Sequence, residues 1–280
     1  MTYCVGLCLK NGLVFLADTR TNAGVDHVGI FRKMTLFQKE KDRFFALMSS
    51  GNLAITQAVK EILLKGKLLG GKNLWNAVNA HEAAEVVGDA IKQVYDRDFV
   101  ALKKAGIDFN CNLIFGGQVR GENPRLFNVY SAGNFIESTP ENCYFQIGES
   151  KYGKPILDRV VNFQTPLNLA TKCALISMDS TLKSNISVGL PLDLLVYEAN
   201  SFHPSKLVTI DESNPYYQMI HQVWGQKLRA AFMEIPEPSW NTSRRGTAIM
   251  AGAKKLSSVP IEHENKKKLI AKPKGQSRKK

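Results

Sequence analysis

The first 17 residues constrain the fold most, because they read as a β-hairpin that begins at the very start of the chain. Residues 3–9 (YCVGLCL) form an apolar run with β-branched and aromatic side chains, which is typical of a strand buried on both faces. The turn sequence Asn11-Gly12 leads into a second apolar run over residues 13–17. Chain ends usually fray, so a strand that starts at residue 3 predicts an amino terminus fixed in a sheet.

Thr2 stands at this fixed end, directly after Met1. Methionine aminopeptidase usually removes an initiator Met that precedes a small residue, which would leave Thr2 with a hydroxyl and a free α-amine. Such an amine has an unperturbed pKa of about 7.7–8.0, so near neutral pH it can take the proton from the hydroxyl. Thr2 is therefore a candidate nucleophile that carries its own base, although very many ordinary proteins also begin with Met-Thr.

Two charged residues are predicted to lie near Thr2. Asp18 follows the second strand and Lys33 precedes the next one, so both lie at the ends of neighbouring predicted strands. A lysine ammonium beside Thr2 would lower the pKa of the amine or the hydroxyl. Asp18 would hold the lysine in place and keep it charged.

Thr2 opening a strand, the segment ADTRTNAG over residues 17–24 and Lys33 together resemble the proteasome β-subunit and HslV group of N-terminal nucleophile hydrolases. The similarity is greatest to Anbu, the bacterial ancestral β-subunit family of predicted proteasome-type proteases. Matching stretches extend from residue 1 to about residue 200: MTYCVGL, DTRTNAGVD, FRKM, SSGNLAITQAV, IGESKYGKPILDR and SMDSTLKSNISVGLPLDLL. The resemblance implies self-assembly into a ring or spiral that encloses the active sites.

The resemblance also implies roles for individual residues. Thr2 matches the family's nucleophile, Asp18 its aspartate and Lys33 its lysine. Gly51 resembles the glycine whose backbone N–H helps to bind the oxyanion. Asn22 falls at a position that contacts the substrate backbone.

One part of the family pattern is altered here. Where proteasomes have Gly-Ser-Gly, this chain reads Gly148-Glu149-Ser150, so Glu149 falls on the serine position. Glu149 could hold the amine protonated and weaken it as a base, or Ser150 could take the serine's role after a small backbone shift. The family's later Asp–Ser pair maps to Asp179 and Ser184, although the local spacing differs.

Composition limits the remaining possibilities. No apolar run approaches the roughly 20 residues that a membrane span needs, and the start lacks a signal-peptide pattern, so a cytoplasmic protein is expected. The five scattered cysteines are predicted to be buried free thiols. The five histidines show no paired-ligand spacing, so neither a catalytic metal nor another cofactor is expected.

Half of the net charge of +12 lies at the end of the chain. Residues 257–280 contain eight Lys or Arg and two Glu, which gives +6. Such a segment has too little apolar area to fold, so we expect one domain over residues 1–240 and a disordered basic tail over residues 241–280. Weak attachment of the tail to a polyanion is the alternative. Stacking on single-stranded nucleic acid is disfavoured, because no aromatic residue interleaves with the lysines.

The middle of the chain predicts the architecture. Helical periodicity covers residues 52–67, 74–104, 154–161, 167–183 and 215–233, and strand patterns cover residues 110–119, 125–132, 144–147, 192–199 and 206–210. This order fits two sheets packed face to face with helices outside. We therefore expect an α+β fold, which the resemblance implies is the four-layer αββα sandwich of N-terminal nucleophile hydrolases.

The function predicted from these residues and from the resemblance is hydrolysis of amide bonds in peptides or polypeptides by a threonine-type peptidase. Two alternatives stay open. The first is an amidase or acyl-transfer enzyme acting on a small non-protein amide, and the second is a weakly active assembly protein. The sequence identifies no ATP-dependent unfoldase partner.

Overall fold

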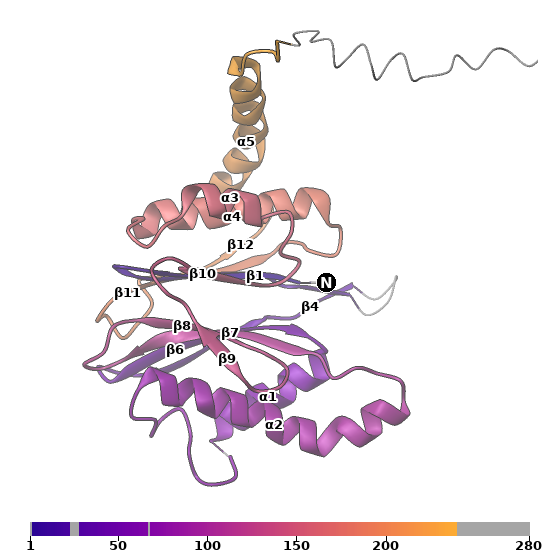
Figure 1. The fold of residues 1–280 in the computed structure, drawn as a ribbon, viewed down its shortest axis with the longest axis vertical. Helices are drawn as coiled ribbons and strands as arrows, with labels where there is room; N and C mark the ends of the chain where they lie inside the picture. Colours follow the sequence, from indigo (N-terminus) through magenta and orange to yellow (C-terminus); the bar gives the residue numbers. More distant parts are fainter. Residues whose placement is uncertain (1, 23–27, 67, 240–280) are drawn as a thin grey trace, which may run out of the picture. The chain divides into compact units, whose positions relative to one another are not determined.

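The computed structural model describes residues 2–22, 28–66 and 68–239, so the predicted basic tail at residues 241–280 lies outside the described part. The chain divides into two units, Met1–Phe232 and Met233–Lys280. In the second unit, the described residues comprise the end of one helix and the irregular residues 235–239. The first unit is a mixed α/β fold with antiparallel sheets (Figure 1).

The first sheet contains the amino-terminal hairpin. Its strands, in spatial order, are β10 (Tyr144–Gly148), β1 (Tyr3–Leu9), β2 (Gly12–Asp18), β11 (Leu192–Glu198) and β12 (Lys206–Ile210). Every residue of β1 and β2 is buried, as the apolar runs predict. Strand β1 is hydrogen-bonded to β2 along one edge and to β10 along the other.

The second sheet is also antiparallel. Its strands are β5 (Met34–Lys39), β6 (Arg43–Gly51), β7 (Cys111–Val119), β8 (Arg125–Val129) and β9 (Phe135–Glu137). A separate two-stranded ribbon consists of β3 (Arg20–Asn22) and β4 (Val28–Ile30). Neither this ribbon nor β9 was expected, since three-residue strands are too short to show an alternating pattern.

The helices are α1 (Leu53–Lys65), α2 (Ala80–Lys104), α3 (Lys154–Val160), α4 (Leu167–Ser184) and α5 (Pro215–Glu234). Helix α2 begins at Ala80 and not at residue 74, which corrects the sequence prediction. The Asn79 side chain caps its start by accepting a hydrogen bond from the Glu82 N–H at 2.7 Å. Upstream, the Asn73 side chain accepts from the Trp75 N–H and closes a turn that competes with helix.

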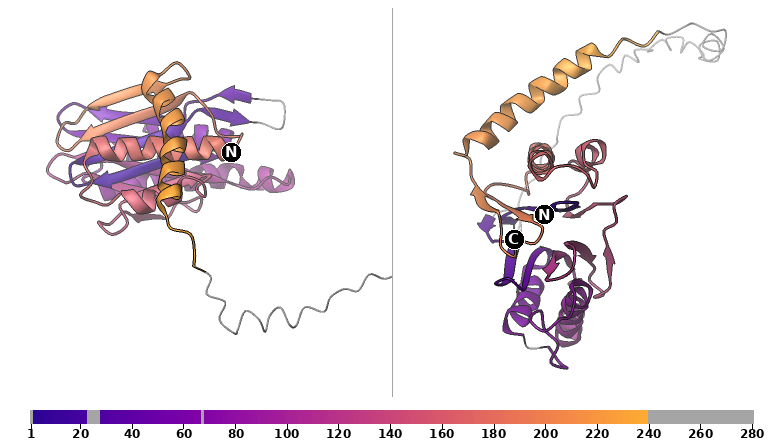
Figure 2. Two further views of the ribbon diagram at one scale, coloured as in Figure 1. Left: turned by 90° about the horizontal axis from the view of Figure 1, so that it is seen from above. Right: turned by 90° about the vertical axis from the view of Figure 1, so that its left-hand side faces the viewer.

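The two sheets face each other, with α1 and α2 over the outer face of one and α3 and α4 over the outer face of the other (Figures 1 and 2). Alternate residues of β1 enter different cores, as a strand period of two requires. Tyr3, Val5 and Leu7 pack toward α4, whereas Cys4 and Cys8 join the core between the sheets. Strand β1 therefore lies within the packed molecule, and its start brings Thr2 to one end of the space between the sheets.

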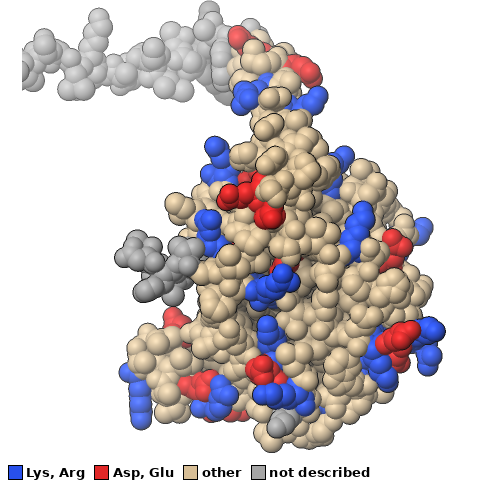
Figure 3. Space-filling model, turned by 180° about the vertical axis from the view of Figure 1, so that it is seen from behind, with Lys and Arg blue, Asp and Glu red and all other residues tan. Residues whose placement is uncertain are grey.

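On the face in Figure 3, basic and acidic side chains are interspersed over the body of the molecule. Within the described residues, every helix is too short or too polar to cross a membrane.

Candidate active site

The backbone of Thr2 is held by a close approach of β10. Tyr3 pairs with Gly148, and one step further the Glu149 N–H donates to the Thr2 carbonyl oxygen at 2.6 Å. Gly148 has φ +82°, and a Cβ at that position would overlap the Thr2 carbonyl oxygen. Only glycine has both the required conformation and the required clearance, so the Gly148-Glu149 segment fixes the first residue of β1.

Lys33 forms a buried ion pair with Asp18. The Lys33 Nζ lies 3.1 Å from Asp18 Oδ1, and the exposed fractions of the two side chains are 7% and 0%. The same ammonium donates to the main-chain carbonyls of Asp18 at 3.0 Å and Arg20 at 2.6 Å. Two hydrogen bonds and one ion pair therefore hold the ammonium in place. Lys33 therefore acts on its surroundings as a fixed positive charge.

Asp18 links this ion pair to the amino-terminal strand. Its Oδ1 also accepts a hydrogen bond from the Tyr3 N–H at 3.0 Å, one residue after Thr2. Burial raises the pKa of the Asp18 carboxyl above its ordinary value, and the Lys33 charge and the Tyr3 N–H oppose part of that rise. The carboxylate thus connects the Lys33 charge directly to the end of β1.

Thr2 and Gly51 open onto the same cavity, which has a volume of about 420 Å³. The residues that line it are Thr2, Thr21, Ser50, Gly51, Asn110, Asn112 and Gly148. Gly51 has φ +115°, and a Cβ there would overlap the Asn110 carbonyl oxygen. The lining is made of small or uncharged polar residues, so the cavity suits a polar group such as a peptide backbone.

Glu149 lies at the Thr2 end of the first sheet and is 8% exposed. Its Oε2 accepts from the Asn185 Nδ2 at 3.1 Å, and its Oε1 accepts from the Lys151 N–H at 3.2 Å. Ser150 follows it in the turn before α3, and the Ser150 carbonyl accepts from the Lys154 N–H. The structure thus joins Glu149 to Asn185, a residue that the sequence analysis did not single out.

Asp179 and Ser184 lie on α4, and the described contacts of Asp179 are with α5. Asp179 Oδ1 is 2.7 Å from the His221 Nδ1 and 3.4 Å from the Tyr217 hydroxyl. Ser184 is the exposed last residue of the helix. The structure brings Thr2, Glu149 and Gly51 together at one end of the sheets. The described side-chain contacts of Asp179 are with α5 and not with these residues.

Asn22 is the last residue of β3, where its backbone pairs with Val28. Its neighbour Thr21 lines the cavity, as do Ser50, Asn110 and Asn112, none of which was anticipated. One signal was available for the two asparagines: they are polar residues at the start of an otherwise apolar predicted strand. Asn185 offered no comparable signal, because its role depends on where α4 ends.

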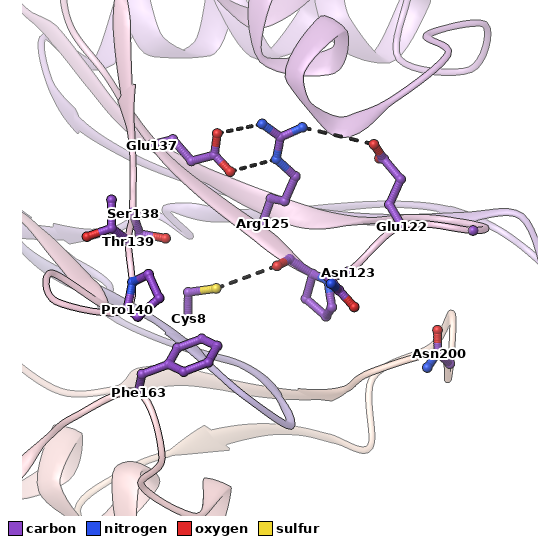
Figure 4. Close-up of a pocket in the computed structure, with 12 residues that line it drawn as sticks. Cys8, Glu122, Asn123, Arg125, Glu137, Ser138, Thr139, Pro140, Phe163 and Asn200 are labelled. Atoms are coloured by element: carbon purple, nitrogen blue, oxygen red, sulfur yellow. Dashed lines mark hydrogen bonds and ion pairs between the residues drawn. The ribbon is translucent and has the colours of Figure 1, made fainter.

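A larger cavity, of about 690 Å³, lies near the other end of β1 (Figure 4). There Arg125 is bound by Glu137 and approached by Glu122 at 4.0 Å, and Cys8 Sγ donates to the Pro124 carbonyl. Burial raises the pKa of the Cys8 thiol to about 11, which makes it a poor nucleophile at neutral pH. Thr2 and the Lys33–Asp18 pair are therefore the better candidates for chemistry.

The described residues include no group of three or more His, Cys, Asp or Glu side chains arranged to hold a metal ion. All five cysteines are free and buried.

Comparison with solved structures shows close relatives. Anbu (ancestral beta-subunit) from Yersinia bercovieri is 48% identical, with a TM-score of 0.79 over 85% of this chain and 100% of that chain. An Anbu (Gly-1) mutant from Hyphomicrobium sp. strain MC1 is 46% identical, with a TM-score of 0.80 over 85% and 100%. The subunit in a helical assembly of the Anbu complex from Pseudomonas aeruginosa is 40% identical, with a TM-score of 0.79 over 85% and 100%. No protein-family model and no curated protein matches the chain.

Proposed function

The chain belongs to the Anbu (ancestral beta-subunit) family, and from that membership we propose that it is a proteasome-type threonine peptidase. The observation that carries the proposal is the cavity shared by Thr2 and Gly51. The Lys33–Asp18 ion pair supports it, because Asp18 accepts the N–H of Tyr3, the residue after Thr2. Removal of Met1 would expose the Thr2 amine beside that cavity.

In the proposed reaction, Thr2 Oγ attacks the carbonyl carbon of the substrate amide and its proton passes to the Thr2 amine, directly or through one water. The Lys33 charge stabilises the negative charge that develops on Oγ. The Gly51 N–H helps to bind the tetrahedral oxyanion. Collapse of this intermediate releases the amine product and leaves an ester on Thr2, which water then hydrolyses with the same base.

The fold and its wider organisation are part of the same proposal. We infer that the two sheets and their helices are the four-layer αββα sandwich of N-terminal nucleophile hydrolases, within one domain over residues 1–240. The relative from P. aeruginosa forms a helical assembly, so self-association into a ring or spiral is proposed here too. Exposed apolar side chains on α5, including Met219, Leu228 and Phe232, support it. The basic tail remains a candidate for weak polyanion contact.

The remaining sequence-predicted site residues stay predictions. Asn22 is predicted to contact the substrate backbone, and Ser150 to assist the amine. Asp179 and Ser184 are predicted to complete the site.

The decisive test compares wild-type protein with Thr2→Ala on a panel of fluorogenic peptides and small non-peptidic amides. Hydrolysis of peptides that is lost in Thr2→Ala supports the peptidase. Hydrolysis confined to small amides would favour an amidase, for which the absence of large apolar side chains from the described cavity lining is the supporting observation. Self-assembly without hydrolysis of any substrate would favour an assembly protein.

A further inference from the structure

Glu149 is a buried carboxylate without a cationic side chain beside it. It is 8% exposed, and its two oxygens accept hydrogen bonds from the Asn185 side chain and the Lys151 N–H. In the described part of the chain, no Lys, Arg or His nitrogen lies within 4.0 Å of it, whereas Asp18 has Lys33. A buried charge is normally paired, so the site has an unmatched negative charge.

The strand register places the main chain of Glu149 against that of Thr2. The Tyr3–Gly148 pair and the hydrogen bond from the Glu149 N–H to the Thr2 carbonyl put Thr2 and Glu149 opposite each other. Strand β10 ends at Gly148, so Glu149 is the first residue of the following turn, and its main chain contacts that of Thr2. Removal of Met1 would create a positive charge, the α-ammonium of Thr2, at this place.

We propose that Glu149 binds the α-ammonium of processed Thr2 and that Asn185 positions Glu149 for this contact. The inference rests on the proposed processing of Met1 and concerns how the site controls its own base. Asn185 is 7% exposed, and its backbone N–H donates to the Thr181 carbonyl at 2.9 Å. Its Oδ1 accepts from the Ser187 N–H at 2.9 Å, so its Nδ2 is the group left to face Glu149.

The contact opposes the effect of Lys33 on the amine. A carboxylate stabilises the charged form of the amine and raises its pKa, whereas Lys33 lowers it. Further charged groups near this end of the sheet, among the described residues, include Asp18, bonded to Tyr3 and Lys33, and the buried Asp193 of β11, which Arg32 approaches at 4.0 Å. Arg20 is also there, and its guanidinium donates to the Ile186 carbonyl. Glu149 therefore keeps more of the amine protonated at neutral pH and moves its use as a base toward alkaline pH.

The test is a titration of the Thr2 amine in the full chain. Protein that begins at Thr2 is obtained by natural processing or from a cleavable leader, and intact mass verifies the start. The amine pKa follows from the pH dependence of ¹³C-formaldehyde labelling read by NMR. We expect Glu149→Gln to lower this pKa by about one unit and Asn185→Ala to lower it by a smaller amount. Glu141→Gln removes an equal charge from an exposed position before β10 and should leave it unchanged.

The outcomes separate this inference from the proposed function. An amine pKa that is the same in wild type, Glu149→Gln and Asn185→Ala overturns the role of Glu149, even if the protein hydrolyses peptides. A lowered pKa in both variants supports it, even if no amide is hydrolysed. If Glu149→Gln does not fold, Asn185→Ala decides. In active protein, the rise of the pH–rate profile should occur at a lower pH in Glu149→Gln than in wild type. The difference in pH should match the difference in amine pKa.

Discussion

The ammonium of Lys33 lies 3.1 Å from a carboxylate oxygen of Asp18, and the same oxygen receives the Tyr3 N–H at 3.0 Å. A single oxygen of Asp18 thus contacts both Lys33 and Tyr3, the residue that follows Thr2. Because both side chains are buried, solvent screens their charges weakly. The arrangement makes the pair important for stability as well as for the proposed chemistry.

Lys33→Met should therefore harm both properties. Removing one member of a buried pair leaves the other charge uncompensated, which costs about 3–5 kcal/mol. Urea unfolding measures this loss, and kcat/KM on a responsive substrate should fall by roughly 100-fold or more. The double variant Asp18→Asn/Lys33→Met is the control. It should recover much of the stability and none of the activity, and recovery of activity would contradict the assigned role of Lys33.

The raised pKa of Asp18 predicts a specific pH dependence. The folded protein binds the Asp18 proton more readily than the unfolded chain does, since burial raises the pKa from its ordinary 3.8. The stabilising contribution of this group is thus complete below 3.8 and is lost as pH rises through the folded-state pKa. The free energy of unfolding of wild type, minus that of Asp18→Asn, should decline over this window. A difference that grows with pH would contradict the prediction.

Activity should follow the opposite course at the acid end. Protonation of Asp18 removes the negative charge that holds Lys33, so the pH–rate profile should fall at a pH above that of an ordinary aspartate. The measurement is kcat/KM against pH at constant ionic strength. A fall of kcat/KM that begins only at pH 3.8 or below would contradict the raised pKa of the buried Asp18.

Gly148→Ala should disrupt the anchoring of Thr2. Gly148 has φ +82° and directly abuts the Thr2 carbonyl, so an added methyl must push β10 away from β1. Gly121→Ala is the matched control, because Gly121 has φ +91° and no atom within 4 Å of the added Cβ. The control should lose about 1–2 kcal/mol from backbone strain alone. Gly148→Ala should lose clearly more in urea unfolding, and equal losses would mean that the close approach is not needed.

His221→Ala should loosen α5. Its ring bonds to the buried Asp179 at 2.7 Å, and that contact joins α5 to α4. Hydrogen exchange of the α5 amides should become several-fold faster. Tyr217→Phe removes only a 3.4 Å contact to the same carboxylate and keeps the buried ring, so its effect should be smaller. Unchanged exchange in His221→Ala would show that apolar packing alone holds the helix.

The sequence predicted the features that depend on local pattern. The β1–β2 hairpin follows from two apolar runs around Asn11-Gly12, and the similarity to Anbu is confirmed at 40–48% identity. The start of α2 was predicted too early, because helical periodicity continues through residues whose Asn side chains form turns. The short ribbon β3–β4 has no periodic signal at all.

Site residues could be predicted only where the local sequence pattern marks them. Thr2, Asp18 and Lys33 stand at strand ends that the pattern marks. The Glu149–Asn185 contact joins residues 36 positions apart, and it depends on the register of β10 against β1 and on the residue at which α4 ends. Asp179 was matched to the site by similarity of sequence, whereas its observed contacts to α5 depend on the packing of two helices.

The central claim, that Thr2 supplies both nucleophile and base, is tested most directly by intact mass spectrometry after treatment with a peptide epoxyketone. Such an electrophile reacts with both the hydroxyl and the amine of an amino-terminal threonine. We predict one adduct per chain on protein that has lost Met1, and no adduct on Thr2→Ala. Retained Met1 in the assembled native protein, or processed protein that stays unlabelled, would contradict the account.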